Sequence, residues 1–147
     1  MTKSGRLRLR GTVAVPLPPR LALDLFTPSG ERAWVAGWDP RFPEPVENEV
    51  EPGTVFTTGH GGRRSTWVVT RHQPGKWVAY AVVTGGERAG TVAVACRPCP
   101  GGTIATVTYQ LTALTPEAVP ALARFGTGFD SFLANWQEEI AAALRPG

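Results

Sequence analysis

The sequence predicts an α+β fold in which an antiparallel sheet packs against one long C-terminal helix, with two short helices after the first strand. Three observations support this prediction. Apolar and polar residues alternate with a period of two through most of the chain, short segments with Gly and Pro separate these runs, and residues 115–144 carry apolar side chains every three or four positions. A period of two indicates half-buried strands, and spacings of three and four indicate an amphipathic helix.

Length and composition predict a single domain spanning residues 1–147. The chain has 147 residues, 42% of them apolar, which is enough for a hydrophobic core and excludes general disorder. A net charge of +3 is too small to indicate a nucleic-acid binder, and no apolar run approaches the length of about 18 residues that a membrane span needs. The N-terminus lacks the apolar segment of a secretory signal. We therefore expect a cytoplasmic protein with no membrane span.

The first third of the chain predicts one strand, two short helical segments and a loop. Residues 6–13 place arginine or threonine on one face of a strand and leucine, glycine or valine on the other. Prolines at 16–19 end this strand, and because Pro suits the first turn of a helix we expect a helix over Pro19–Phe26. Residues Glu31–Val35 form a second short helix or turn. Four prolines and four glutamates between Pro40 and Pro52 predict an irregular, solvated loop.

The middle of the chain predicts a meander of antiparallel strands. Five alternating runs are separated by Gly- or Pro-bearing turns, as in consecutive β-hairpins. These runs are Thr54–His60, Arg64–Arg71, Lys76–Thr84, Glu87–Arg97 and Thr103–Leu114.

The turn at Gly85-Gly86 predicts which side chains face the core. If it is a two-residue turn, Thr84 lies opposite Glu87 and Ala81 lies opposite Gly90. Carried across the sheet, this register collects large apolar side chains and two alanines on one face and threonines on the other. The inner face is then Phe56, Trp67, Val69, Trp77, Ala79, Ala81, Val92, Val94, Val107, Tyr109 and Leu111. We therefore expect Trp67, Trp77 and Tyr109 to share the inner face, and Thr108 to lie on the other.

The C-terminal segment predicts a long amphipathic helix. Thr115 is suited to its N-cap and Pro116 to its first turn. Its apolar stripe is Val119, Leu122, Phe125, Phe129, Phe132, Leu133, Trp136, Ile140 and Leu144. Gly126 and Gly128 lie inside this helix, where each costs about 1 kcal/mol relative to alanine. A kink, or the close approach of another group, would account for them.

Several short motifs carry a resemblance to known proteins. They are Phe26-Thr27-Pro28, Gly30-Glu31-Arg32, Trp34, Gly37-Trp38-Asp39-Pro40, Gly53-Thr54-Val55-Phe56, Trp67-Val68-Val69, Gly102-Thr103 and Tyr109-Gln110-Leu111-Thr112-Ala113-Leu114. With the order of elements, they resemble the SRPBCC or START-like superfamily, the helix-grip fold of polyketide cyclase-like proteins, in a bacterial branch whose function is mostly unassigned. The resemblance covers about residues 5–144.

The resemblance implies a cavity. In this superfamily a curved sheet wraps around the long helix and encloses an apolar space. The alanines at 79 and 81 and the glycines at 126 and 128 are then interpreted as positions that leave volume open. The alternative is simple close packing between sheet and helix.

The cysteines and histidines give little support for redox or metal chemistry. Cys96 and Cys99 have the spacing of a redox or zinc pair, but they fall at a strand end, without the helix N-terminus that activates such thiols. A structural zinc needs four ligands, and the chain has no second pair of cysteines. We therefore expect no metal and no cofactor. His72 is expected at the surface, and His60, beside a glycine pair, is a candidate polar anchor at a cavity mouth.

Charged residues near the short helices have two interpretations. Glu31, Arg32 and Asp39 lie among tryptophans. Glu31 is either a desolvated acid with a raised pKa, suited to proton transfer, or the partner of an arginine that holds the short helices together. We favour the second. The arginines at 6, 8 and 10 predict a solvated outer face, and without adjacent aromatics they do not indicate binding to single-stranded nucleic acid.

The resulting hypothesis is binding of a small hydrophobic or amphipathic molecule between sheet and helix. The expected cavity lining is Trp34, Trp38, Phe56, Trp67, Trp77, Tyr109, Phe125 and Phe129, with Glu31, Arg32 and His60 as polar anchors. One alternative is a cyclase or dehydratase-like enzyme in which Glu31, Tyr109 or His60 moves protons. The other is a protein-interaction module of the chaperone-activator type. Two titratable groups converging inside the cavity would favour the enzyme, and a closed, filled interior would favour the module.

Overall fold

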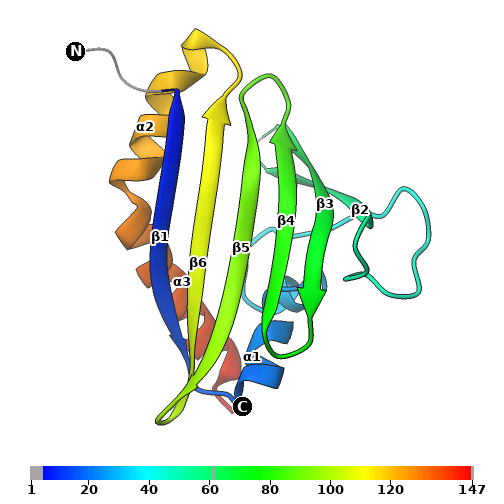
Figure 1. The fold of residues 1–147 in the computed structure, drawn as a ribbon, viewed down its shortest axis with the longest axis vertical. Coiled ribbons are helices and arrows are strands. Elements are labelled where there is room, and N and C mark those ends of the chain that lie inside the picture. Colours follow the sequence, from blue (N-terminus) through cyan, green and yellow to red (C-terminus); the bar gives the residue numbers. More distant parts are fainter. Residues whose placement is uncertain (1–4, 61, 147) are drawn as a thin grey trace.

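The computed structural model describes residues 5–60 and 62–146 and has the predicted α+β architecture (Figure 1). Six antiparallel strands form one open sheet in the order β1-β6-β5-β4-β3-β2. Their bounds are β1 Arg6–Val15, β2 Val55–His60, β3 Arg63–Gln73, β4 Trp77–Thr84, β5 Arg88–Cys99 and β6 Gly102–Ala113. Every neighbouring pair except β1–β6 is a hairpin, so the turns predicted from Gly and Pro determine most of the topology.

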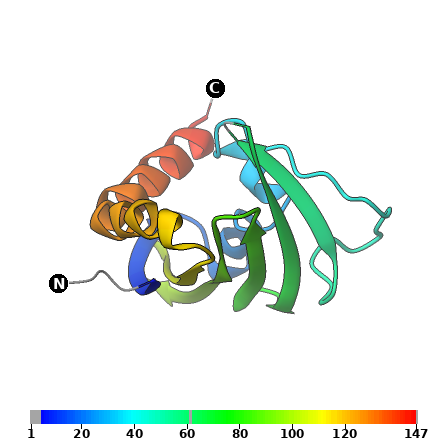
Figure 2. The same ribbon diagram turned by 90° about the horizontal axis from the view of Figure 1, so that it is seen from above.

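The helices all lie on one side of this sheet. They are α1 Pro19–Asp24, η1 Gly30–Ala33, η2 Pro116–Ala118, α2 Val119–Thr127 and α3 Phe129–Leu144. The helix α3 packs on β1, α2 packs on β1 and β6, and α1 packs on β5 and β6. Figure 2 shows the sheet curving beneath them. In the part of the chain that the structure describes, no helix is long and apolar enough to cross a membrane.

The C-terminal helix is broken into α2 and α3. One of its two glycines lies at the break, and the other lies where a strand approaches the helix closely, as expected from the sequence. At Gly128 the backbone leaves helical geometry (φ −91°, ψ 7°), and this residue separates α2 from α3. At Gly126 an added Cβ would lie 3.0 Å from a terminal carbon of Leu7 on β1, so the helix approaches the strand closely there. The interpretation that Gly126 leaves volume open is wrong, because Leu7 occupies that space.

The predicted register between β4 and β5 is wrong by one residue. Thr84 pairs with Arg88 and Ala81 pairs with Thr91, so the loop has three residues rather than two. Within it the Glu87 N–H donates to the Thr84 carbonyl at 3.0 Å, and Gly86 takes the positive φ of +71° that this turn needs.

This shift reverses the two faces of β4, because side chains alternate along a strand. The inward residues are Val78, Tyr80 and Val82, all buried. Those turned outward are Trp77, Ala79 and Ala81, on the same face as Thr108.

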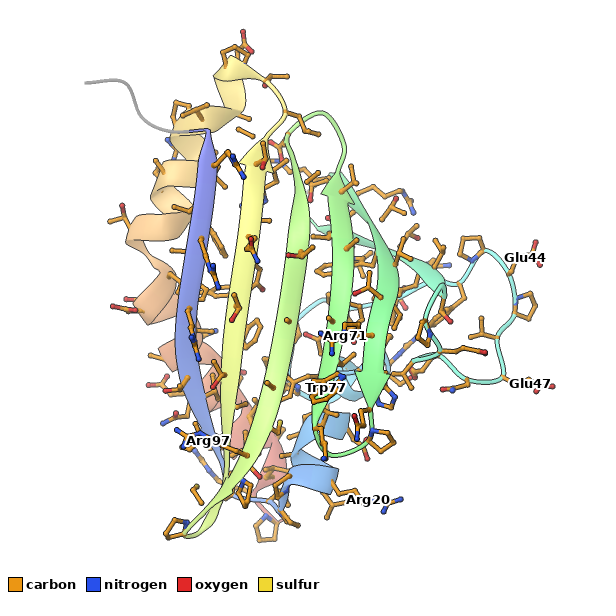
Figure 3. All side chains as sticks on the ribbon, in the orientation of Figure 1. Arg20, Glu44, Glu47, Arg71, Trp77 and Arg97 are labelled. Atoms are coloured by element: carbon orange, nitrogen blue, oxygen red, sulfur yellow. The ribbon has the colours of Figure 1, made fainter. Side chains whose placement is uncertain are left out.

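Trp77 therefore lies outside and not beside Trp67 and Tyr109. There it stacks under the guanidinium of Arg71, with Cζ 5.1 Å from the ring centroid (Figure 3). A bulge in β3 between Val69 and Arg71 turns Arg71 to this outer face. The alanines at 79 and 81 also face outward. The interpretation that they leave volume open in the interior is therefore wrong as well.

The core fills one end of the concave face and leaves the other end open. Near α1 the interior is closed by Phe26, Leu23 and Val94, which are almost completely buried. The Tyr80 hydroxyl donates to the Phe26 carbonyl at 2.7 Å and joins α1 to the middle of the sheet. The opposite end, where β4 ends and β5 begins, is therefore the place where a cavity can form.

Gly90 allows β5 and β6 to approach closely next to that open end. It pairs with Val82 on one side and Leu111 on the other. An added Cβ at Gly90 would overlap the backbone carbonyl oxygen of Gln110. Glycine within a strand commonly marks such a close backbone approach.

We expect Gly90→Ala to lower the free energy of unfolding by about 3 kcal/mol, because the new methyl group must displace a strand backbone. Gly85→Ala is the matched control, since an added Cβ there meets nothing within 4 Å and the residue does not have a positive φ. Urea denaturation of both variants makes the comparison. Equal stability of the two would contradict this account of Gly90.

Candidate functional site

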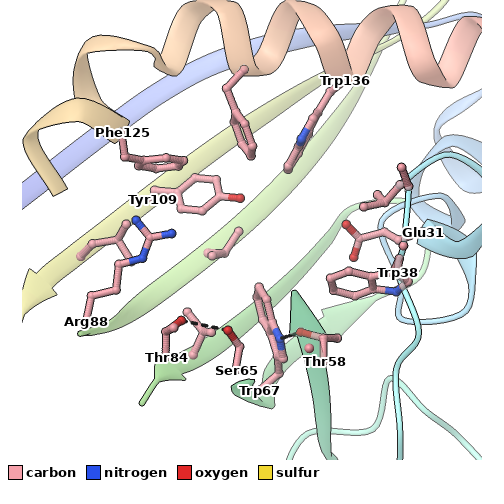
Figure 4. A pocket seen from close by; sticks show the side chains of 18 residues that line it. Glu31, Trp38, Thr58, Ser65, Trp67, Thr84, Arg88, Tyr109, Phe125 and Trp136 are labelled. Carbon is pink, nitrogen blue, oxygen red and sulfur yellow. Dashed lines mark hydrogen bonds between the residues drawn. The ribbon is translucent and has the colours of Figure 1, made fainter. Parts of the chain in front are cut away.

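A cavity of about 330 Å³ lies between the open end of the sheet and the two C-terminal helices. Three walls enclose it: strands β2 to β6, the helices α2 and α3, and the segment from η1 to Trp38 (Figure 4). Its volume falls at the lower end of the range of roughly 300–1,000 Å³ that small-molecule sites occupy.

The helical wall is aromatic. Phe125, Phe132 and Trp136 face the cavity from α2 and α3, at helical spacings of seven and four residues. They surround Tyr109 of β6, whose ring meets that of Phe125 edge-on at 5.3 Å between centroids. Phe129 packs behind Tyr109 at 5.7 Å and holds it forward.

The opposite wall consists of two tryptophans whose N–H groups are already satisfied. Trp67 donates to the Thr58 hydroxyl at 3.0 Å, and Trp38 donates to the Pro28 carbonyl at 2.8 Å. The two rings meet edge-on at 5.8 Å, and Phe56 stacks behind Trp67 with an interplanar angle of 3°. This wall therefore offers ring surface to an occupant and no free indole donor.

Glu31 brings a carboxyl group into the cavity from η1. The local fold fixes its position: Gly30 packs so tightly on α1 that an added Cβ would overlap the Asp24 carbonyl, and the Glu31 N–H donates to the Thr27 carbonyl at 3.0 Å. Among the described residues, no side chain forms an ion pair or hydrogen bond with the Glu31 carboxylate. Burial raises its pKa well above the ordinary value of 4.5.

The favoured interpretation of Glu31 as an arginine's partner is therefore wrong. Arg32 turns away from the cavity to Asp39 at 3.6 Å and to the Pro40 carbonyl at 3.2 Å. These two residues hold the segment after η1, and both are exposed. The raised pKa of Glu31 instead matches the other interpretation, a desolvated acid.

Arg88 faces Glu31 across the cavity. Its Cζ lies 4.8 Å from the ring centroid of Phe125, and its sequence neighbour Glu87 is paired with Arg63 at 3.1 Å. Tyr109 lies between the side chains of Arg88 and Glu31 (Figure 4). Burial and the nearby Glu31 raise the pKa of Tyr109, while Arg88 lowers it, with a net increase. Tyr109 thus remains a protonated hydroxyl at neutral pH.

The structure brings together five of the residues expected at the site and separates the rest. Trp38, Trp67, Tyr109, Phe125 and Glu31 line the cavity. The other predicted lining residues are not in it: Trp34, Phe56 and Phe129 are buried in the core, and Trp77 lies on the outer face. Of the remaining anchors, Arg32 is exposed, and His60 ends β2 with its side chain outside the described residues.

Sequence reasoning missed three important lining residues: Arg88, Phe132 and Trp136. The two aromatics already belonged to the predicted apolar stripe of the C-terminal helix, so the stripe itself was the signal. Arg88 lies four residues from Val92 on β5 and therefore on the same face, so the predicted inward position of Val92 was the signal for it.

The cysteine pair lies away from this cavity. Both thiols are free, and both belong to the far end of β5. Cys96 packs against the core, and burial raises its pKa to about 11, opposite to the lowered pKa of a reactive thiol. Among the described residues, no group of three or more His, Cys, Asp or Glu side chains is placed to hold a metal ion.

Comparison with known proteins supports the fold alone. No family model matches the chain, and no curated protein matches it. Solved structures do match. An uncharacterised protein from Rhizobium leguminosarum has a TM-score of 0.68 at 19% identity, over 93% of this chain and 95% of that one.

Two further solved structures have the same fold. CalU16 from Micromonospora echinospora has a TM-score of 0.62 at 16% identity, over 92% of this chain and 75% of its own. DynU16, a protein in the dynemicin biosynthetic locus, has a TM-score of 0.61 at 17% identity, over 89% of this chain and 46% of its own. At the level of the fold, these likenesses fit the helix-grip arrangement that the resemblance implied.

We expect Glu31→Gln to stabilise the protein more at pH 8 than at pH 5. Because the folded-state pKa of Glu31 is raised, its protonated form stabilises the fold below about pH 4.5, and this contribution is lost as the pH rises through the folded-state pKa. Glutamine does not ionise, so the variant keeps its stability as the pH rises. Melting temperatures at the two pH values measure it.

Glu47→Gln is the control, because it removes a carboxylate outside the cavity. Glu47, labelled in Figure 3, lies in an exposed loop. A gain in melting temperature for Glu31→Gln that is equal at pH 5 and pH 8 would contradict the buried position of this carboxyl.

Proposed function

We propose that this protein binds a small amphipathic molecule in the cavity between β3–β6 and the C-terminal helices. The observation that carries the proposal is the combination of aromatic walls with a few inward polar groups in one cavity of about 330 Å³. Ligand sites are typically apolar spaces with a small number of placed polar groups that set orientation.

The aromatic walls support a mainly apolar occupant. Trp38 and Trp67 have satisfied N–H groups, and the rings of Phe125 and Phe132 have no polar atoms. Water in this space would find few hydrogen-bond partners, whereas a buried water typically makes about three. Displacing it with an apolar group is therefore favourable.

The open cavity argues against the interaction-module alternative. That alternative expects a closed, filled interior, and here the core closes only the α1 end of the sheet. The two functions that use the cavity, binding and catalysis, are therefore better supported than an interaction module.

Blocking the cavity tests the binding proposal. Val92 is a buried cavity residue in the middle of β5, and Thr91 is exposed on the other face of the same strand. We expect Val92→Phe to weaken binding of a fluorescent naphthalene-type probe by about tenfold or more, a loss of about 1.4 kcal/mol. Its melting temperature should stay within about 3 °C of the wild type, because the ring enters empty space.

Thr91→Phe is the matched control, since it adds the same ring outside the cavity. Its probe affinity should equal that of the wild type. Unchanged affinity in Val92→Phe would mean that the probe does not bind in this cavity, and a wild type that binds no probe would reject the proposal.

A cyclase or dehydratase-like activity is the second candidate, and one observation favours it. Glu31 and Tyr109 both reach the cavity, and both have raised pKa values. A protonated, desolvated carboxyl is suited to act as a general acid, and a neutral phenol can stabilise a developing oxyanion by hydrogen bonding.

Glu31→Gln separates this candidate from binding alone. If the protein catalyses a reaction on its ligand, we expect this substitution to reduce turnover by about 10²–10⁴-fold while the probe affinity stays within about twofold. Product analysis by mass spectrometry, after incubation with a polyketide-like carbonyl substrate, measures the turnover. Unchanged turnover in the variant would mean that Glu31 does not act as the general acid.

A further inference from the structure

We propose that the occupant of this cavity is a monoanion whose carboxylate binds to Arg88 and whose uncharged, apolar body extends toward Glu31. The inference rests on the proposed binding function and adds to it the charge and the orientation of the ligand. It follows from how the charged side chains around the cavity are paired.

Arg88 is a cation without an anionic partner in the described structure. Among the described residues, no carboxylate lies within ion-pair distance of its guanidinium, which packs over the ring of Phe125. The nearest acid in sequence, Glu87, is engaged by Arg63 at 3.1 Å. A partly buried arginine usually has a carboxylate or phosphate partner. Here a ligand bound in the cavity would supply that anionic partner.

The position of Arg88 suits a carboxylate. Phe125 covers the guanidinium at 4.8 Å, which restricts the side chain before any ligand binds and leaves its edge toward the cavity (Figure 4). The planar fork of donors on arginine matches the two oxygens of a carboxylate. The hydroxyls of Ser65 and Thr84, 2.9 Å apart, provide further hydrogen-bonding groups in the same wall.

The other end of the cavity does not supply a competing negative charge. Among the residues whose side chains the structure describes, the titratable ones that line the cavity are Glu31, Tyr109 and Arg88. Burial favours the neutral forms of Glu31 and Tyr109. When Glu31 and Tyr109 are protonated, the described lining of the cavity carries the single positive charge of Arg88. A monoanion balances it, whereas a cationic ligand would meet repulsion at one end and a neutral carboxyl at the other.

The space available limits the apolar body to about two fused rings. A dry cavity of about 150 Å³ accepts benzene, and this one has about 330 Å³. The rings of Trp67 and Phe132 then contact the body from opposite walls. A naphthalene ring system is therefore a suitable test body, and its substituent can be changed without changing its shape.

The test compares three probes that share one ring system and carry an anionic, a neutral or a cationic head group: 2-naphthoate, 2-naphthamide and 2-naphthylmethylammonium. Calorimetric titration at pH 7 gives each affinity for the wild-type protein. We expect 2-naphthoate to bind about 10- to 100-fold more tightly than 2-naphthamide, as expected for a hydrogen bond to a charged group. The ammonium probe should bind most weakly.

Arg88→Gln tests the residue. We expect it to remove the preference for 2-naphthoate and to leave the affinity for 2-naphthamide within about twofold. Arg97→Gln is the matched control, because Arg97 lies exposed on the outer face of the same strand and carries the same charge (Figure 3). Arg88→Lys keeps the charge without the planar fork and should retain part of the preference.

The outcomes separate this inference from the proposed function. Equal affinity of the wild type for all three probes, or a preference for the ammonium probe, would overturn the inference and leave the binding function in place. Binding of none of the three would reject both. The preference of the wild type is measured without any variant, so the inference remains falsifiable even if Arg88→Gln does not fold.

Discussion

The register between β4 and β5 is the constraint on which the rest of the site depends. A three-residue loop, Gly85–Glu87, places Thr84 opposite Arg88 and turns Tyr80 and Val82 to the same inner face as Arg88. Tyr80 then reaches α1 and closes one end of the interior. Arg88 reaches the open end and supplies its positive charge. With a two-residue loop, every side chain of β4 would change faces, and Tyr80 would leave the interior.

The two ends of the concave face illustrate different uses of buried polar atoms. At the closed end the Tyr80 hydroxyl is satisfied within the protein, and the side chain contributes to stability. At the open end the carboxyl of Glu31 has no protein partner among the described residues, and burial shifts its protonation toward the neutral form. A desolvated carboxyl of this kind is costly to ionise. Its presence in a cavity, away from the packed core, is typical of a functional site.

The sequence predicts the framework well because each element has its own local signal. Alternation identifies the strands, and the stripe from Val119 to Leu144 identifies the C-terminal helix. The faces of β4 were not predictable in this way, because residues 77–83 are apolar on both sides and do not favour one register. The glycine pair at 85–86 fits a two-residue or a three-residue loop equally well. Arg88 and Glu31 meet across one cavity only after the sheet curves, a long-range consequence that no local pattern contains.

The satisfied N–H groups of Trp38 and Trp67 have a consequence for specificity. A wall that presents ring surface discriminates by shape, and one methylene more or less changes binding by only about 1–3 kcal/mol. A wall with unpaired polar groups rejects a mismatched ligand far more strongly. This cavity combines both kinds of surface, because Glu31 lies beside Trp38 and Arg88 faces them from the opposite side. If the cavity binds the proposed ligand, such a site would distinguish sharply among head groups and tolerate variation in the body attached to them, so it would suit a set of related molecules as readily as a single compound.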